Sequence, residues 1–317
     1  MSAAGRAGLA RLGERVWEAR RAVWARGWQR ARRVDARVVS VGNLTVGGAG
    51  KTTLVRHLAA VSAATGAPTA VVCRRYRPGP EGTSDEERLL TRALPGVAIH
   101  AGTRKVDLAA AAAAAGARVV VVDDGFSHWA LARDVEIVMV DVREPLAEQR
   151  MLPGGRLREP WRALQRADFV VASRLDEGES PDGAFAWLRD HAPAARLAAG
   201  RHAVTGVRGL ASGPAAFGGR VRVVTGTGHP ESVARTARAA GFEVTALAAY
   251  RDHHWFSRAE AERETRAAGA DHARVLLTAK DAVRWPLADD PLVLEVEWRW
   301  VRGGEAVERA VTGEEAR

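Results

Sequence analysis

The segment from Ser40 to Val55, SVGNLTVGGAGKTTLV, joins an apolar strand pattern to a glycine-rich turn and a Lys-Thr pair. Glycines in such a turn let consecutive N–H groups converge on an anion, and a following helix start adds its positive dipole end. The signature G-x-x-x-x-G-K-[ST] fits with one departure, a threonine in the first glycine position. The alternative is an ordinary glycine turn. The predicted phosphate loop consists of Thr45, Val46, Gly47, Gly48, Ala49, Gly50, Lys51 and Thr52.

A pair of carboxylates follows the valine-rich segment 119–122. Asp123 and Asp124 stand at the end of this predicted strand, and adjacent carboxylates are costly unless a cation or hydrogen-bond donors compensate them. The alternative is a solvated Asp-Asp turn. Beside a phosphate loop, we expect Thr52 and one of the two aspartates to hold Mg²⁺.

Two further motifs carry groups suited to proton transfer. Asp85 and Glu86 lie in TSDEERLL at a predicted loop-to-helix start, and Asp252, His253 and His254 lie in YRDHHWFS just after a predicted strand. A carboxylate and a histidine, brought from two domains to a cleft, could deprotonate an alcohol. The alternatives are that the acidic residues only cap a helix, and that the His-His pair is structural or exposed.

These motifs must be positioned by a regular framework, and alternating strand and helix patterns begin at Val38. We predict a parallel sheet of the P-loop NTPase type with helices on both faces, and after a Gly/Pro/Ala-rich stretch at 206–219 a second, smaller α/β domain. The predicted domains are 1–37, 38–205 and 206–317. Predicted strands span 38–42, 69–73, 118–122, 135–141, 168–172, 220–225, 243–249, 274–278 and 292–298; predicted helices span 52–64, 103–116, 230–240 and 257–269.

The net charge of +9 is concentrated at the N-terminus. Residues 1–37 carry ten arginines and a net charge of +7, so the remaining 280 residues are nearly neutral, which argues against a nucleic-acid-binding body. Leu9, Leu12, Val16, Val23, Trp24 and Trp28 recur at helical spacing within 7–33. The segment is therefore predicted to form an amphipathic helix, which either lies on an anionic membrane surface or packs on the body.

Rare residue types narrow the possibilities further. Only Lys51, Lys105 and Lys280 occur among 47 basic residues, so the lysines are candidates for roles that a bulky guanidinium does not fill. A single cysteine, Cys73, excludes an internal disulfide framework and suits a reducing cytosol. The sequence contains no run of 18 or more apolar residues, so no membrane-spanning helix is predicted.

Taken in order, these motifs resemble those of the tetraacyldisaccharide 4′-kinases of lipid A biosynthesis. VGNLTVGGAGKT is similar to the family's phosphate loop, and DDGFSH, LPGGRLREP, TGTGHPESV, DHHWFS and LLTAKDAVRW follow in the family's order. CRRYRPG and SDE resemble the family's Ser-Arg-Gly-Tyr-Gly and Gly-Asp-Glu segments. The departures are Cys73, Arg75, Ser127 and Ala279, together with the residues around His229.

The resemblance implies transfer of the γ-phosphoryl group of ATP, with Mg²⁺, to the 4′-hydroxyl of tetraacyldisaccharide 1-phosphate. It implies that Asp85 acts on the sugar hydroxyl with His253, that Lys51 balances charge, and that Glu86 assists the metal or the base. Arg156 and Arg158 become candidate clamps for the substrate's phosphate; rim salt bridges with Glu159 are the alternative.

A lipid substrate would place the protein at the cytoplasmic face of a Gram-negative inner membrane, held peripherally by its N-terminal helix. The rival interpretation is a P-loop ATPase or GTPase of another class, of the partition or metal-delivery type. TAKD at 278–281 partly imitates the guanine-reading motif of GTPases, but lacks its leading asparagine.

Overall fold

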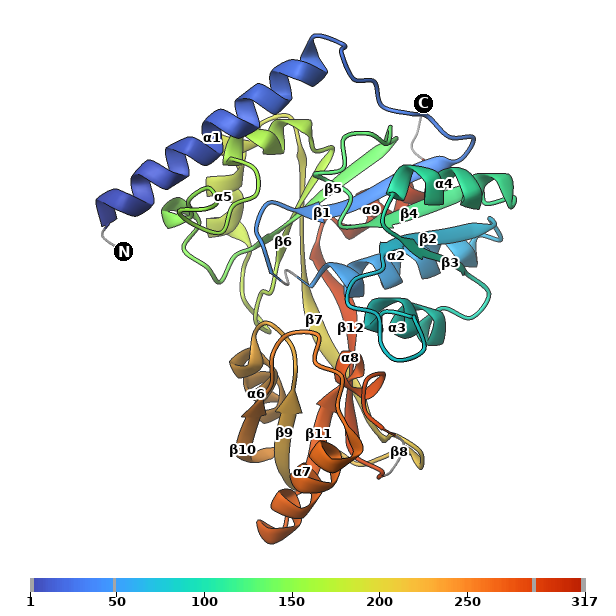
Figure 1. The fold of residues 1–317 in the computed structure, drawn as a ribbon, viewed down its shortest axis with the longest axis vertical. Helices are drawn as coiled ribbons and strands as arrows, with labels where there is room; N and C mark the ends of the chain where they lie inside the picture. Colours follow the sequence, from blue (N-terminus) through green and yellow to red (C-terminus); the bar gives the residue numbers. More distant parts are fainter. Residues whose placement is uncertain (1–2, 48–49, 287–288, 315–317) are drawn as a thin grey trace. The chain divides into compact units, whose positions relative to one another are not determined.

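The computed structural model describes residues 3–47, 50–286 and 289–314, which divide into two compact units (Figure 1). The first unit comprises Met1–Arg74, Leu94–His202 and Trp298–Arg317. The second comprises Arg75–Ala93 and Ala203–Glu297. Neither unit is a continuous stretch of chain, and the strands β7 and β12 contribute residues to both.

The first unit is built on a parallel sheet with the strand order β7-β6-β5-β1-β4-β2-β3. Strand β1 lies between β4 and β5, so the ends of these three strands meet at one edge of the sheet. All five residues of β4 are buried, which requires cover on both faces. The strands are β1 (Arg37–Asn43), β2 (Thr69–Arg74), β3 (Ala98–Gly102), β4 (Val119–Asp123), β5 (Val135–Asp141), β6 (Phe169–Ser173) and β7 (Arg196–Gly209).

Helices of the first unit cover this sheet in separate apolar clusters. Helix α4 packs with Val38, Val72 and Val120 in one cluster, and helix α5 packs with Val138 and Val170 in another. The prediction of a parallel sheet enclosed by helices is therefore confirmed. The helices are α2 (Lys51–Ala64), α4 (Lys105–Ala114), α5 (Asp182–His191), α9 (Gly304–Thr312) and the short 3-10 helices η1 (Leu146–Glu148) and η2 (Trp161–Arg166).

The second unit is a smaller α/β arrangement in which β10, β9, β11 and β12 run parallel in that order. A cluster of buried side chains, including Val224, Phe256 and Trp285, forms one of its cores. Its strands are β8 (Gly213–Pro214), β9 (Arg220–Thr225), β10 (Glu243–Ala249), β11 (Arg274–Thr278) and β12 (Leu292–Arg302); its helices are α3 (Asp85–Ala93), α6 (Pro230–Ala239), α7 (Arg258–Ala270) and α8 (Ala279–Ala282).

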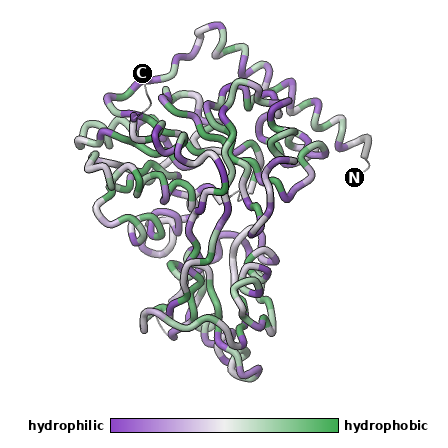
Figure 2. The backbone as a smooth tube through the Cα atoms, turned by 180° about the vertical axis from the view of Figure 1, so that it is seen from behind, coloured by the Kyte–Doolittle hydropathy of each residue, from purple (hydrophilic) through white to green (hydrophobic). Residues whose placement is uncertain are grey.

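The N-terminal helix α1 (Ala3–Ala25) belongs to the first unit and packs on it through Ala10 and Trp17, the latter only 6% exposed. Leu12 and Val16 lie on a different side of the helix and are 54% and 62% exposed. Along α1, near the N label in Figure 2, hydrophobic and hydrophilic residues alternate. No helix in the described part of the chain is both long and apolar enough to cross a membrane.

Several features of the fold were not predicted from the sequence, and no predicted strand or helix covers β3, α5 or the first part of β7. Strand β7 continues to Gly209, into the stretch that its glycines marked as irregular, and α1 ends before Trp28. Helix α9 begins at Gly304 after the left-handed Gly303 and packs against α2. Each depends on neighbouring strands or helices, which local patterns do not show.

Candidate functional site

The entry to the phosphate loop is fixed by backbone pairing with the LREP segment. Thr45 and Leu157 form an antiparallel bridge, and the Val46 N–H donates to the Arg156 carbonyl over 2.8 Å. The Thr45 hydroxyl also accepts a hydrogen bond from the Asn43 side chain at 3.1 Å. A strand-like entry suits a β-branched residue, which explains the threonine in the first glycine position.

Gly50 lies in the phosphate loop directly before helix α2. Its φ of 79° lies in the left-handed region, and a Cβ atom there would approach the His202 ring to 2.1 Å. The His202 Nε2 atom lies 3.3 Å from the Gly50 carbonyl oxygen. Burial lowers the pKa of His202 to about 4, so a neutral ring with a proton on Nε2 donates this bond. The predicted loop residues Gly48 and Ala49 lie outside the described residues.

Lys51 is the first residue of α2 and points back across the loop. Its ammonium donates to Asn43 Oδ1 over 2.9 Å and lies 3.4 Å from Asp124 Oδ1. The lysine therefore already occupies an anionic environment, and a phosphate would replace a carboxylate and an amide as its partner.

Candidate oxygen ligands for a magnesium ion also lie close together in the first unit. The hydroxyl of Thr52, the second residue of α2, lies 3.3 Å from Asp123 Oδ2 at the end of β4. Hydroxyl and carboxylate oxygens are the hard ligands that Mg²⁺ prefers, so these residues fit the ion. The described residues contain no cluster of three or more His, Cys, Asp or Glu arranged for a metal. Glu86, also expected near the metal, belongs to the second unit.

Asp124 adopts the left-handed conformation, with φ of 54°, and receives a two-pronged hydrogen bond from Arg158 at 2.8 and 2.6 Å. Burial by itself raises the pKa of Asp124, but Arg158, Lys51 and Lys105 more than reverse this effect and hold it well below its usual range. The side chain therefore stays ionised as the partner of two cations.

Lys105 is a site residue whose role the motifs did not reveal. It is 5% exposed, and its ammonium donates to the carbonyl oxygens of Asp123 and Asp124 over 2.6 and 2.5 Å. Burial lowers the pKa of Lys105, against the pull of the two aspartates. The lysine holds the turn that presents both carboxylates, and the scarcity of lysine was the signal that marked it.

Arg156 and Arg158, the two candidate clamps for the substrate's phosphate, both have partners within the first unit. Besides its bonds to Asp124, Arg158 donates to Asn43 Oδ1 over 2.6 Å. Arg156 is exposed, pairs with Glu144 and donates to the Val46 carbonyl over 3.0 Å. Both arginines thus border the phosphate loop, and their contact with a substrate's phosphate stays a prediction.

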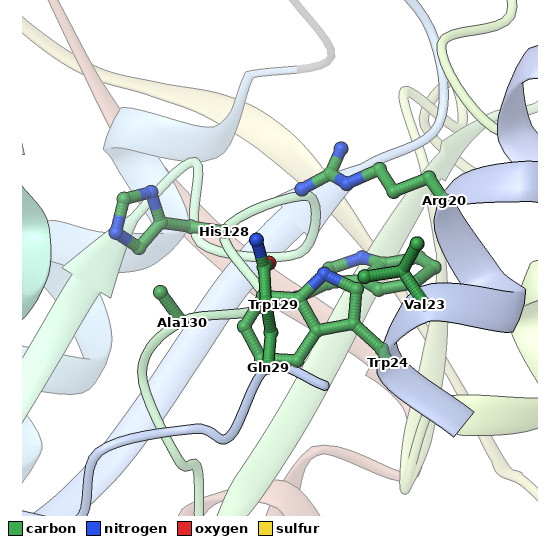
Figure 3. Close-up of a pocket in the computed structure, with 7 residues that line it drawn as sticks. All are labelled: Arg20, Val23, Trp24, Gln29, His128, Trp129 and Ala130. Carbon is green, nitrogen blue, oxygen red and sulfur yellow. The ribbon is translucent and has the colours of Figure 1, made fainter. Parts of the chain in front are cut away.

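A cavity of about 380 Å³ lies between helix α1 and the loop that follows Asp124 (Figure 3). Trp24 and Trp129 lie together at one side, while Arg20 and His128 face the same space. Burial, with Lys105, Arg133 and Arg20 nearby, lowers the pKa of His128 and keeps its ring neutral. The cavity therefore combines aromatic walls with polar groups from two separate segments.

The second unit joins the two remaining predicted residues. Asp85, the first residue of α3, is 1% exposed, and His253 Nδ1 lies 3.0 Å from its Oδ2 atom. His253 reaches this position with a left-handed backbone, φ 62°, and its ring packs edge-on against Tyr76. The predicted contact between residues 168 positions apart is thus present, but both residues belong to the second unit, whereas the sequence analysis expected them to come from two domains.

Two cations complete the surroundings of Asp85. Arg284 and Lys280 lie 3.6 and 3.7 Å from Asp85 Oδ2, and Lys280 also pairs with Glu86 at 3.3 Å. Burial by itself raises the pKa of Asp85, but His253, Lys280 and Arg284 outweigh it and lower the pKa below its usual value. Asp85 is therefore an ionised, buried carboxylate at neutral pH.

Neighbouring polar residues have structural partners instead. His254 lies 3.1 Å from Glu260, whose side chain completes the capping box of α7, and stacks on Tyr250. In the TAKD segment, Asp281 is bound by Arg284 and by the Gly226 N–H at 2.5 and 2.9 Å. Asp281 thus supports the Gly226 turn, which leaves the guanine-reading interpretation without its carboxylate.

Comparisons with known proteins identify the family to which this chain is similar. The model of the family described as tetraacyldisaccharide-1-P 4′-kinase matches residues 7–313. A tetraacyldisaccharide 4′-kinase of Anaeromyxobacter dehalogenans strain 2CP-C is 37% identical over 92% of this chain and 85% of its own length. One from Geobacter sulfurreducens is 34% identical over 82% of this chain and 78% of its own length. A crystal structure of LpxK from Aquifex aeolicus in complex with ATP superposes with a TM-score of 0.73 at 20% identity, covering 96% of this chain and 98% of the other.

Proposed function

This chain belongs to the tetraacyldisaccharide-1-phosphate 4′-kinase family, and from that premise we propose that it transfers the γ-phosphoryl group of ATP to the 4′-hydroxyl of tetraacyldisaccharide 1-phosphate. The observation that carries the proposal is the Asp85–His253 pair. A partition ATPase or a metal-delivery GTPase would also need the phosphate loop, but hydrolysis alone gives no reason for a second unit that buries an ionised carboxylate against a histidine. The family match over residues 7–313 favours the kinase over both.

The first unit is proposed to hold the nucleotide. Lys51 and the loop 45–52 would bind the triphosphate, and Thr52 with Asp123 would hold Mg²⁺, which neutralises phosphate charge when bound. Lys105 would keep the Asp123–Asp124 turn in place. Arg156 and Arg158 remain proposed clamps for the acceptor's anionic phosphate.

The second unit is proposed to act on the acceptor. Asp85 would take the proton of the 4′-hydroxyl as that oxygen bonds to the γ-phosphorus and the bond to the bridging oxygen of ADP breaks. His253 would donate a hydrogen bond that orients Asp85, while Glu86 and Lys280 would set the charge around the carboxylate. Phosphoryl transfer depends chiefly on positioning and charge, which is what this set of residues supplies.

The direct test is turnover by the purified chain with ATP, Mg²⁺ and tetraacyldisaccharide 1-phosphate in detergent micelles. We expect one equivalent of ADP for each phosphorylated lipid, and Lys51→Ala should abolish it. Asp271→Asn, which changes an exposed carboxylate at the end of α7, is the matched control and should keep full activity. No phosphorylated lipid from the parent chain would remove the proposed function.

We further propose that the protein is peripheral at the cytoplasmic face of the inner membrane and that α1 mediates the attachment. Leu12 and Val16 are exposed on the helix, and Arg11 and Arg15 are exposed beside them in sequence. Apolar side chains next to arginines suit an anionic bilayer surface.

Point variants test this attachment better than deletion, because α1 also packs on the first unit through Trp17. The double variant L12E/V16E should lose binding to vesicles of phosphatidylglycerol and phosphatidylcholine, while L12A/V16A should lose only part of it. Unchanged binding by L12E/V16E would contradict attachment through this helix.

A further inference from the structure

The carboxylate of Glu159 is one of the most buried charges of the first unit, at 1% exposure. It accepts hydrogen bonds from the indole N–H groups of Trp17 and Trp129, at 2.9 and 3.2 Å, and from Arg166 at 2.6 Å. A buried carboxylate needs such donors, because an uncompensated charge away from water is strongly unfavourable. Trp17, Trp129, Glu159 and Arg166 are called the Glu159 cluster below.

One donor of the Glu159 cluster comes from helix α1. Trp17 binds Glu159 and also packs edge-on against Trp129, with 6.2 Å between ring centroids. Trp24, two turns further along α1, packs on Trp129 at the same separation and is seen beside it in Figure 3. The helix therefore contacts the cluster through one hydrogen bond, two aromatic contacts and the Arg20 guanidinium, which lies 4.7 Å from the Trp129 ring centroid.

The other side of the cluster leads to the phosphate loop. Arg158 directly precedes Glu159 in the chain; its N–H donates to the Leu44 carbonyl over 2.7 Å, and its guanidinium forks onto Asp124. Arg166 lies over the Phe126 ring at 4.3 Å, two residues beyond Asp124. Two routes thus join Glu159 to the carboxylate that faces Lys51.

We propose that Glu159 is a positioning residue for phosphoryl transfer. A hydrogen bond from Trp17 of the docked helix α1 holds Glu159 in place, and Glu159 in turn fixes the position of Arg158 on Asp124. In this role the N-terminal helix contributes to the chemical step as well as to membrane attachment. The inference rests on the proposed kinase function. A small displacement of a positioned group is enough to lower turnover by one to two orders of magnitude.

The test measures kcat and KM in detergent micelles, where vesicle binding plays no part. Trp17→Phe keeps an aromatic side chain, although a smaller one, and removes the N–H donor; we expect about a tenfold fall in kcat with an unchanged KM for the lipid. Trp24→Phe is the matched control, because its indole N–H makes no hydrogen bond within the described residues. It should stay within about twofold of the parent, the level of a lost packing contact.

A double-mutant cycle separates positioning from general destabilisation. If Trp17 acts through Arg158, Trp17→Phe should lower kcat much less in an Arg158→Ala background than in the parent. Glu159→Gln, which keeps the shape but loses the charge, should fall between the parent and Glu159→Ala.

Three outcomes would overturn the inference: additive effects in the cycle, equal losses in Trp17→Phe and Trp24→Phe, or an unchanged kcat with a lower melting temperature. The attachment variant L12E/V16E should retain its kcat in micelles. If the parent itself gives no phosphorylated lipid, the proposed kinase function fails. That failure is distinct from a failure of the inference about Glu159, which the double-mutant cycle tests.

Discussion

Each of the two units surrounds a carboxylate with cations, but we propose different roles for the two carboxylates. In the first unit, Asp124 faces Lys51 and Arg158, so an aspartate partners cations that a phosphate also attracts. In the second unit, Asp85 is surrounded by His253, Lys280 and Arg284, so donors are gathered around a single carboxylate. Both carboxylates stay ionised. In the proposed function, the cations beside Asp124 also bind a phosphate, whereas Asp85 accepts a proton.

Within the second unit, the largest expected effect comes from Asp85→Asn. Loss of the proton acceptor should lower kcat by about 10³-fold, within the range for general base catalysis, while ATP binding should stay close to that of the parent. Lys51→Ala should weaken ATP binding as well as turnover. Measured by nucleotide titration and product formation, equal losses of ATP affinity in both variants would break the comparison between the units.

Next in size is the contrast between the two adjacent histidines. His253→Gln should lower kcat by about 10- to 100-fold, because Asp85 loses its orienting donor. His254→Gln disturbs the Glu260 cap and the stacking on Tyr250; it should change kcat by less than about twofold while costing about 1 kcal/mol of stability. Steady-state kinetics and thermal melting check both. A larger kinetic effect at residue 254 would reverse the assignment.

His202 gives the first unit a pH-dependent stability. Its folded pKa of about 4 lies below the unfolded value near 6.5, so the unfolded chain binds more protons between these limits. Stability is therefore lost as the pH falls from about 6.5 towards 4. Between pH 7 and 4.5, the free energy of unfolding of His202→Gln should fall by about 2 kcal/mol less than that of the parent, measured by urea unfolding.

The surface residue His272 provides the control for this measurement. His272→Asn changes an exposed histidine with φ of 48°, a conformation that asparagine accepts, and should follow the parent. An identical pH dependence in His202→Gln and the parent would refute the buried neutral histidine.

The smallest effect is expected from Arg156→Gln. This arginine is exposed and pairs with Glu144, and exposed pairs of this kind contribute little. The KM for ATP should rise by less than about threefold, as the loop entry keeps its backbone pairing. A tenfold higher KM for the lipid would instead favour the sequence-based prediction that Arg156 clamps the acceptor's phosphate.

The sequence predicted the features that depend on local pattern and motif order. Strand β5 and strand β9 match their predicted bounds, and the loop carrying Lys51 lies where its glycines indicated. The Asp85–His253 pair came from motif resemblance, because no periodicity connects residues so far apart. In the structure the pair appears as a 3.0 Å contact.

What could not be predicted depends on tertiary contact between distant segments. The partners of Lys105 are carbonyl oxygens, which every residue carries and no motif records. Glu159 receives donors from positions 17, 129 and 166, so its role exists only after folding. The same holds for Arg158, which lies beside the phosphate loop because its guanidinium binds Asp124.

Every lysine of this chain lies in one of the two groups of site residues: Lys51 and Lys105 in the first unit and Lys280 in the second. Amine-directed labelling followed by mass spectrometry would therefore report only on these regions and on the chain terminus. Protection of Lys51 by nucleotide and of Lys280 by the acceptor could be followed separately, in the unmodified protein and without any engineered probe.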